Sequence, residues 1–284
     1  MKTSYAVRLG AVVAGAAMFA AACSSDSAGS GGDASAGDSG GGEASGETLK
    51  VGVKYDQPLF GVNTPDGVVG FDAEIAKIIG EELGRPVEFQ EAVSANRETF
   101  LEQGTVEVVV ATYTINDARK EKISFAGPYY VAGQDIMVPA DNPLGIAGID
   151  DLNSADVTVC TAEGSTSLEN LQSMAPDADI VTFDTYSKCA DAMGQGRADA
   201  VSTDNVILLG LASESDGAYV LVENPFTEEP YGIGVAKDSP LRCEINTILT
   251  TIYEDGRWAQ AYQDTIGTVV STTPEPPAVD NEGC

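Results

Sequence analysis

Residues 111–130 read ATYTINDARKEKISFAGPYY and follow a short apolar run, VEVVV, at residues 106–110. An apolar run that gives way to small polar residues predicts a buried parallel strand with Thr112 and Thr114 at its carboxyl end. In open α/β sheets, ligands lie beyond that end of the strands. The sequence NDAR then predicts a capped short helix that holds Arg119 near the two hydroxyl groups. A guanidinium group beside hydroxyl and amide donors predicts a carboxylate receptor, with a solvated surface arginine as the alternative.

Strands and helices alternate on both sides of this stretch. Strand, helix, strand, helix and strand are predicted at residues 49–55, 71–83, 87–89, 95–103 and 106–110. A second alternation, which again begins with a strand, is predicted at residues 157–160, 165–174, 179–183, 188–193, 198–201 and 205–213. This order predicts an α/β fold with parallel sheets and right-handed crossovers.

Extended segments at residues 131–139 and 231–236 join the two alternating series. Two crossings of this kind predict a two-lobed α/β fold whose lobes face each other across a cleft and close on a ligand. One continuous, doubly wound domain is the alternative. The predicted parts are lobe 1 at residues 48–135 plus 234–269, lobe 2 at residues 136–233, and a C-terminal tail at residues 270–284.

The amino-terminal residues have the pattern of a lipoprotein signal peptide. Lys2 and Arg8 accompany an apolar run, and small residues precede Cys23. We expect residues 1–22 to be removed and a lipid on Cys23 to anchor the protein outside the bacterial cell membrane, with unlipidated secretion as the alternative. Residues 23–47 are rich in Ser, Gly, Ala and acids, which predicts a flexible tether.

The composition excludes several classes of function. The 284 residues include 44 acidic, 15 basic and no histidine residues, which gives a formal net charge of −29. Such an acidic surface has too few cations to neutralise phosphates, so nucleic-acid binding is excluded. The absence of histidine excludes Ser-His-Asp and Cys-His catalysis and His-containing zinc sites. We expect neither a cofactor nor a metal, and we expect a monomer.

Four cysteines follow Cys23, and an even number in an exported chain predicts two disulfides. Four cysteines permit three pairings. We favour Cys160 with Cys189 and Cys243 with Cys284, because the second pair would hold the Pro-rich tail. Free buried thiols are the alternative.

Two further cations are predicted at the same sheet edge as Arg119. Lys54 lies near the carboxyl end of the first predicted strand. Arg97 lies in the first turn of a helix that begins near Ser94, where the helix dipole disfavours a cation. Three converging cations predict a ligand with two carboxylates, although each alone is also compatible with a solvated surface charge.

The second series of elements contributes a carboxylate and a helix start to the predicted cleft. Asp204 ends a predicted strand and would accept from an α-ammonium group, cap the next helix, or do both. Gly164, Ser165 and Thr166 open a helix whose N–H groups would face an anion. Glu163 is an acid beside this expected anion site.

Six segments match one protein family in chain order over about residues 48–266. They are KVGVKYDQP at 50–58, GFDAE at 70–74, SANR at 94–97, the stretch at 112–130, GSTS at 164–167 and DAVSTD at 199–204. Together they resemble the glutamate-binding branch of the family 3 solute-binding proteins, which deliver polar amino acids to ABC importers. The resemblance implies a periplasmic-binding-protein-like fold and an ABC permease in the membrane as partner.

The same resemblance implies a role for each candidate site residue. Arg119 with Thr112 and Thr114 would hold the α-carboxylate of the ligand. Lys54, Ser94 and Arg97 would hold its side-chain carboxylate. Asp204 would bind the α-ammonium group, and Gly164, Ser165 and Thr166 would close from the second lobe.

The leading hypothesis is a membrane-anchored receptor that binds L-glutamate non-covalently between two lobes and delivers it to a permease. Aspartate or glutamine are the alternative ligands. An enzyme of the cyclohexadienyl dehydratase type, with Glu163 as its acid, is an alternative of another class, and a sensing domain is a third. Asp56, close to Lys54 in sequence, would either orient that lysine or repel a second carboxylate.

Overall fold

The computed structural model describes residues 46–284, which lie within one compact unit. The predicted signal peptide, Cys23 and all but the end of the predicted tether lie outside the described residues. Gly46 contacts the rest of the folded unit, since its N–H donates to the carbonyl of Gly84 at 3.0 Å. Among residues 46–284, no helix combines the length and the apolar character that a membrane span requires.

Five strands form the first sheet, in the order β5-β1-β6-β13-β7. Their bounds are Leu49–Val53 for β1, Val87–Glu91 for β5, Val108–Val109 for β6, Ile123–Ala132 for β7 and Glu229–Ala236 for β13. β1 runs parallel to both β5 and β6, as the alternation of strands and helices predicted. β13 runs antiparallel to β6 and β7. The carboxyl ends of β1, β5 and β6 therefore lie at one edge.

The second sheet has the order β10-β9-β11-β8-β12. Its strands are β8 (Gln134–Pro139), β9 (Thr158–Ala162), β10 (Asp179–Phe183), β11 (Ala200–Asp204) and β12 (Tyr219–Leu221). β9 is parallel to β10 and β11, whereas β8 is antiparallel to β11 and β12. The fold is thus the predicted two-lobed α/β fold, and we call the two sheets with their helices the first and second lobes.

Two connections cross between the lobes. β7 belongs to the first sheet, Gly133 follows it, and β8 begins the second sheet at Gln134. β13 brings the chain back, and it pairs with β7 from Glu229 to Ala236. The sequence predicted both crossings as plain extended segments, but the structure incorporates them into the sheets.

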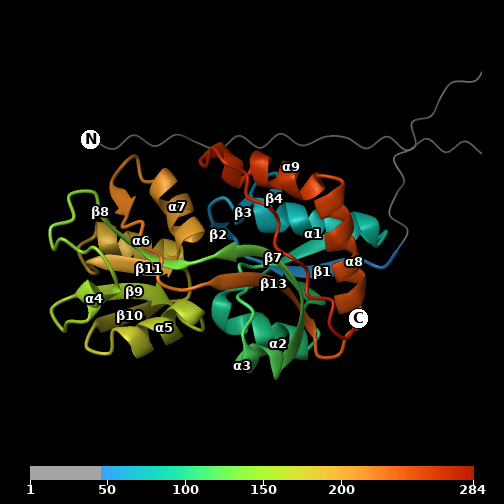
Figure 1. The fold of residues 1–284 in the computed structure, drawn as a ribbon, viewed down its shortest axis with the longest axis horizontal. Helices are drawn as coiled ribbons and strands as arrows, with labels where there is room; N and C mark the ends of the chain where they lie inside the picture. Colours follow the sequence, from blue (N-terminus) through green and yellow to red (C-terminus); the bar gives the residue numbers. More distant parts are fainter. Residues whose placement is uncertain (1–45) are drawn as a thin grey trace, which may run out of the picture. The chain divides into compact units, whose positions relative to one another are not determined.

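The helices cover both faces of the sheets (Figure 1). The α-helices are α1 (Phe71–Glu82), α2 (Arg97–Glu102), α3 (Asp117–Lys120), α4 (Ile149–Leu152), α5 (Thr166–Met174), α6 (Tyr186–Gly194), α7 (Asn205–Ser213), α8 (Leu241–Glu254) and α9 (Arg257–Asp264), and 3₁₀ turns are η1 (Ser94–Asn96) and η2 (Ile266–Thr268). On the first sheet, α1, α8 and α9 lie on one side, and α2 and α3 lie on the other.

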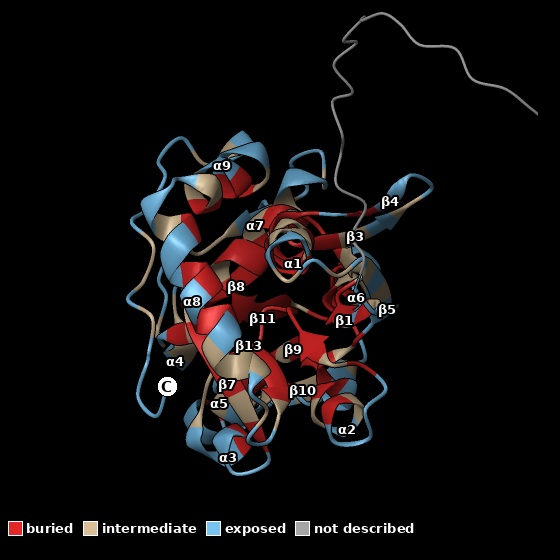
Figure 2. Ribbon diagram, turned by 90° about the vertical axis from the view of Figure 1, so that its right-hand side faces the viewer, coloured by how far each residue is buried: buried red, intermediate tan, exposed pale blue. Residues whose placement is uncertain are grey.

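Buried residues gather between the first sheet and its helices (Figure 2). Many of the buried residues in this core are aromatic. Phe71 on α1 contacts Tyr130, Trp258 and Tyr262 at ring-centroid distances of 6.0, 5.7 and 6.1 Å. Aromatic side chains bury large apolar areas, so this cluster fixes α9 against α1.

Two disulfides join the cysteines in the favoured pairing. Cys160 on β9 is bonded to Cys189 on α6, and Cys243 on α8 is bonded to Cys284 at the end of the tail. The tail also contacts the first lobe, where Asp280 N–H donates to the carbonyl of Gly127 at 2.8 Å.

A third, three-stranded sheet was missed in the sequence. It consists of β2 (Asp56–Gln57), β3 (Gly61–Thr64) and β4 (Gly67–Val69), which pair in antiparallel order. The turn between β3 and β4 has a turn-forming sequence, TPDG at 64–67, and Gly67 has a φ of 119°. These strands are too short for alternating hydrophobicity to reveal them.

Candidate functional site

Thr112 and Thr114 follow β6, at the edge where the sequence placed them. Thr112 has a φ of 44°, which is unusual for a β-branched residue and is costly unless its surroundings hold it. The Thr112 N–H donates to Asp72 Oδ2 at 2.9 Å, and Gln57 Nε2 donates to Thr112 Oγ1 at 3.2 Å. Thr114 forms a β-bridge with Tyr231 on β13. The loop is therefore anchored from α1 and from a crossing strand.

Arg119 is held by the loop that it follows. Asn116 caps α3, as predicted, and its Oδ1 accepts from Arg119 N–H at 2.9 Å. The guanidinium Nη1 donates to the Thr114 carbonyl at 2.7 Å, and Nε lies 3.4 Å from Glu98 Oε1. The side chain is 7% exposed, so it faces the interior of the protein rather than solvent.

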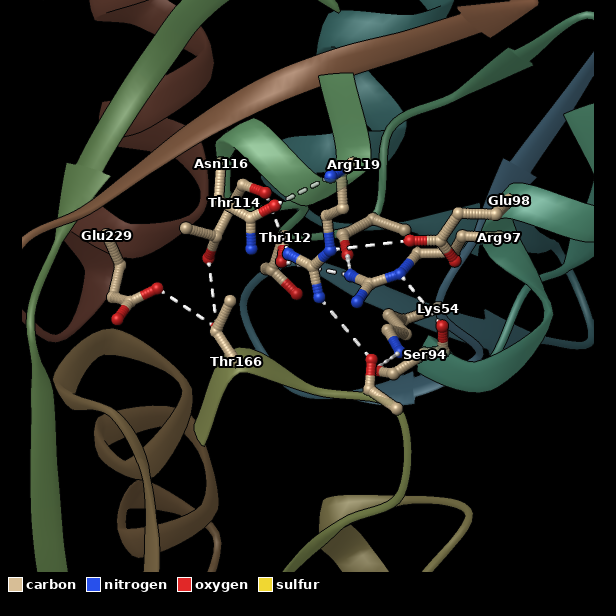
Figure 3. A network of polar contacts seen from close by, with 12 residues as sticks. Lys54, Ser94, Arg97, Glu98, Thr112, Thr114, Asn116, Arg119, Thr166 and Glu229 are labelled. Carbon is tan, nitrogen blue, oxygen red and sulfur yellow. Dashed lines mark hydrogen bonds and ion pairs between the residues drawn. The ribbon is translucent and has the colours of Figure 1, made fainter. Parts of the chain in front are cut away.

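Lys54 and Arg97 lie beside Arg119, so the three cations converge (Figure 3). Lys54 Nζ donates to Ser94 Oγ at 2.9 Å. Arg97 Nη1 donates to the carbonyls of Ala111 at 3.0 Å and Thr112 at 3.2 Å. Both cations are buried, at 4% and 3% exposure, and no carboxylate of the described residues is within ion-pair distance of either.

Electrostatics within this group disfavour the charged forms. Burial lowers the pKa of Lys54 well below its usual value, and the positive charge of Arg97 lowers it further. Burial and the charge of Arg119 likewise lower the pKa of Arg97. Among the described residues, only neutral oxygen atoms accept hydrogen bonds from Lys54 and Arg97, so an anion bound beside them would stabilise their charged forms.

The second lobe reaches this group through the loop between β9 and α5. Arg119 Nη2 donates to the Gly164 carbonyl at 3.4 Å. Thr166 Oγ1 lies 3.4 Å from Thr114 Oγ1 and donates to Glu229 Oε2 at 3.0 Å. The lobes are therefore in direct contact around the site.

Ser165 has a structural role at the start of α5. Its Oγ accepts from Leu168 N–H at 3.1 Å and donates to the Ala162 carbonyl at 2.7 Å. The Ser165 hydroxyl, which we expected to contact the ligand from the second lobe, is thus engaged in capping the helix. At this end of α5, the Gly164 carbonyl contacts Arg119, whereas the Thr166 hydroxyl contacts Thr114 and Glu229.

Asp204 ends β11 and is 3% exposed. Its Oδ2 accepts from the Tyr231 hydroxyl at 2.6 Å, whereas Oδ1 is buried without a hydrogen-bond partner in residues 46–284. The sequence also allowed Asp204 to cap α7. In the structure its side chain makes no capping hydrogen bond to that helix. Burial, together with the nearby charge of Glu229, raises the pKa of Asp204 to about 7.

Asp72, Glu98, Glu229 and Tyr231 were not assigned to the site from the sequence. Asp72 accepts from both the Thr112 N–H and the Tyr129 hydroxyl, and burial raises its pKa to about 7. Glu229 begins β13, far from its partner Thr166 in sequence. Asp72 stands inside the GFDAE segment that carries part of the family resemblance, and this signal could have identified it. No local pattern distinguishes Glu229 or Tyr231.

Asp56 and Glu163, whose roles the sequence left open, have different surroundings in the structure. Asp56 accepts a hydrogen bond from the hydroxyl of Ser187 on α6, across the two lobes. Glu163 is exposed and lines a hollow at the edge of the site beside Arg119 and Lys122. In residues 46–284, no group of acids and cysteines has the arrangement of a metal site.

Comparisons with known proteins agree with this geometry. A family model described as bacterial extracellular solute-binding proteins, family 3, matches residues 49–268. The glutamate-binding protein GluB of Corynebacterium efficiens is 35% identical over 231 residues, which are 76% of this chain and 78% of that protein. The ABC transporter glutamine-binding protein GlnH of Bacillus subtilis is 37% identical over 218 residues, which are 75% of this chain and 78% of that protein.

Among solved structures, an ancestral amino acid-binding protein that is a precursor of cyclohexadienyl dehydratase superimposes with a TM-score of 0.72. It is 34% identical in sequence, and the match covers 77% of this chain and 95% of that chain. The family match extends over both lobes, and it agrees with the resemblance that the six sequence segments carry. The chain therefore belongs to the bacterial extracellular solute-binding proteins, family 3.

Proposed function

We propose that this protein binds L-glutamate non-covalently between its lobes and delivers it to the permease of an ABC importer. The observation that carries the proposal is the burial of Lys54 and Arg97 without an acidic partner in the described part of the chain. Buried cations without counter-ions are costly, and a ligand carboxylate would remove that cost. The names of the relatives, which refer to glutamate and glutamine, support an amino acid as ligand.

Each charged group of glutamate has a complementary group in the site. Arg119, with the hydroxyl groups of Thr112 and Thr114, would hold the α-carboxylate between the loop after β6 and the start of α5. The unpartnered Oδ1 of Asp204 would accept from the α-ammonium group. Lys54 and Arg97, with Ser94, would then bind the side-chain carboxylate.

Glutamine is the second candidate, because the GlnH relative is named for it. Charge-assisted hydrogen bonds contribute about 1.5–3 kcal/mol each. One such bond, lost on exchange of the carboxylate for an amide, corresponds to roughly a 10- to 150-fold difference in affinity. We therefore expect glutamate to bind more tightly than glutamine.

Calorimetric titration with L-glutamate, L-glutamine and L-aspartate tests the proposal. Arg119→Ala should abolish binding of all three, since each has an α-carboxylate. Arg197→Ala is a matched control, because Arg197 is exposed and lies on the second lobe away from the cation group. Unchanged glutamate binding in the Arg119→Ala variant would refute the proposed site.

We further propose that the protein is non-catalytic and attached to the membrane by lipid on Cys23. The exposed position of Glu163 does not suit a general acid that must work in a closed, dry pocket. Incorporation of radiolabelled palmitate by wild-type protein, and its loss in a Cys23→Ser variant, would test the anchor. Prephenate turnover by the purified protein would contradict the non-catalytic role.

A further inference from the structure

Tyr113 lies between two residues that the sequence assigned to the site, yet the proposed function gives it no role. The Cζ of Arg97 is 4.1 Å from the centroid of its ring, and the Cζ of Arg119 is 4.9 Å from the same centroid. One aromatic ring therefore contacts both guanidinium groups. The sequence pattern alone predicts a core residue here, because Tyr113 follows an apolar strand.

The surroundings of Tyr113 fix the ring in place. It is fully buried, and its centroid lies 4.8 Å from that of Phe125 in an edge-on arrangement. Gly234 on β13 faces the ring, and a Cβ atom at that position would lie 3.0 Å from Tyr113 Cε1 and 3.2 Å from Cδ1. A crossing strand thus leaves just enough room for the ring.

The backbone on either side of Tyr113 binds the same two cations. Arg97 donates to the carbonyls of Ala111 and Thr112, and Arg119 donates to the carbonyl of Thr114. The two guanidinium groups repel each other, since Arg119 contributes to the lowered pKa of Arg97. The negative face of an aromatic ring attracts cations, and this attraction is strongest where water is excluded.

We propose that Tyr113 is a positioning residue that holds the guanidinium groups of Arg97 and Arg119 together against their mutual repulsion. This role rests on the proposed function, in which the two arginines bind different carboxylates of one amino acid. The ring is the part of Tyr113 that acts, because its face contacts both guanidinium groups. The buried hydroxyl lies near Glu98 but makes no hydrogen bond of good geometry in the described part of the chain. A Tyr113→Phe variant, which keeps the ring, should therefore retain the positioning role, and a Tyr113→Leu variant should lose it.

Nuclear magnetic resonance of the arginine side chains tests this role without any ligand. Aromatic ring currents should shift the Arg97 and Arg119 side-chain protons upfield in the wild type and in Tyr113→Phe, and Tyr113→Leu should abolish the shifts. Gly234→Ala should displace the ring without removing it, and should therefore alter the shifts of both arginines. This variant provides the test if Tyr113→Leu does not fold. Arginine signals that stay unchanged in the variants that lose or displace the ring would overturn the proposal.

Calorimetry with L-glutamate then measures the consequence for binding. Tyr113→Leu should raise the Kd at least about tenfold, and Tyr113→Phe should leave it within about threefold. Leu101→Val is the matched control, because Leu101 belongs to the same apolar cluster as Tyr113. Its truncation should lower the stability of the fold but leave the Tyr113 ring in contact with both arginines. Equal losses of affinity in Tyr113→Leu and Leu101→Val would overturn the positioning role. Absence of glutamate binding by the wild type would instead refute the proposed function, while the spectra still decide the role of Tyr113.

Discussion

Gly210→Ala should weaken ligand binding without weakening the fold. Gly210 lies inside α7, where its backbone is helical and suits alanine. A Cβ atom there would lie 2.5 Å from the carbonyl oxygen of Pro58, which belongs to the first lobe. Next to this contact, Asp56 accepts a hydrogen bond from Ser187 on α6. The segment that follows β1 therefore contacts two helices of the second lobe.

The expected magnitude follows from two opposite effects. Alanine in place of glycine inside a helix favours the helix by about 1 kcal/mol, whether the lobes are apart or together. An added methyl group in a packed contact costs roughly 1–3 kcal/mol, but this cost arises only while Pro58 and α7 are in contact, that is, while the lobes are together. If ligand binding requires closure, affinity should fall roughly 5- to 150-fold.

Calorimetry with L-glutamate and thermal unfolding of the ligand-free protein form the assay. We expect Gly210→Ala to raise the Kd while the unfolding temperature of the ligand-free protein stays the same or rises. Gly80→Ala is the matched control, because its Cβ would collide with Val87, which lies in the same lobe as α1. That variant should lower stability and leave affinity unchanged. A Kd of Gly210→Ala equal to that of the wild type would refute the link between this contact and binding.

Three further predictions concern charge, pH and the disulfides. Lys54→Met should reduce the preference for glutamate over glutamine by roughly tenfold or more in calorimetry, and an unchanged ratio would contradict its contact with the side-chain carboxylate. Because the pKa of Asp204 is raised to about 7 and an ammonium ligand needs the ionised form, affinity should fall as the pH drops through 7. The part of this dependence that belongs to Asp204 should disappear in Asp204→Asn, and a profile identical to the wild type would exclude it. Replacement of Cys160 and Cys189 by serine should cost about 2–4 kcal/mol in denaturant unfolding but leave the Kd nearly unchanged, since neither sulfur atom contacts the cation group.

The sequence predicted the parts of the fold that depend on local patterns. Runs of apolar residues and helix-capping residues indicated the alternating elements of both lobes, and their bounds in the structure differ mostly by a few residues. The convergence of Lys54, Arg97 and Arg119 was predictable for a topological reason. Residues that follow parallel strands of one sheet lie at the same edge, whatever their distance in sequence.

The contacts between the lobes were not predictable from local patterns. Asp56 and Ser187 are 131 residues apart, and Thr166 and Glu229 are 63 residues apart. Such pairs depend on how two separately folded sheets meet, and periodicity within one element carries no information on that. The role of Tyr113 was hidden for a related reason, because an aromatic residue after an apolar strand is typical of a core and reveals nothing about the cations packed on it.

The way this protein holds its buried cations bears on the choice of ligand. Carboxylates bound directly to Lys54 and Arg97 would neutralise them, and a ligand would then have to displace or share those acids. Instead, Lys54 donates to a serine hydroxyl and Arg97 to backbone carbonyls and an aromatic ring, all of them neutral. Neutral acceptors orient a cation while leaving its charge available, so the positive potential is directed at the ligand. A neutral side-chain amide would leave much of that potential uncompensated, and an acidic side chain would compensate it.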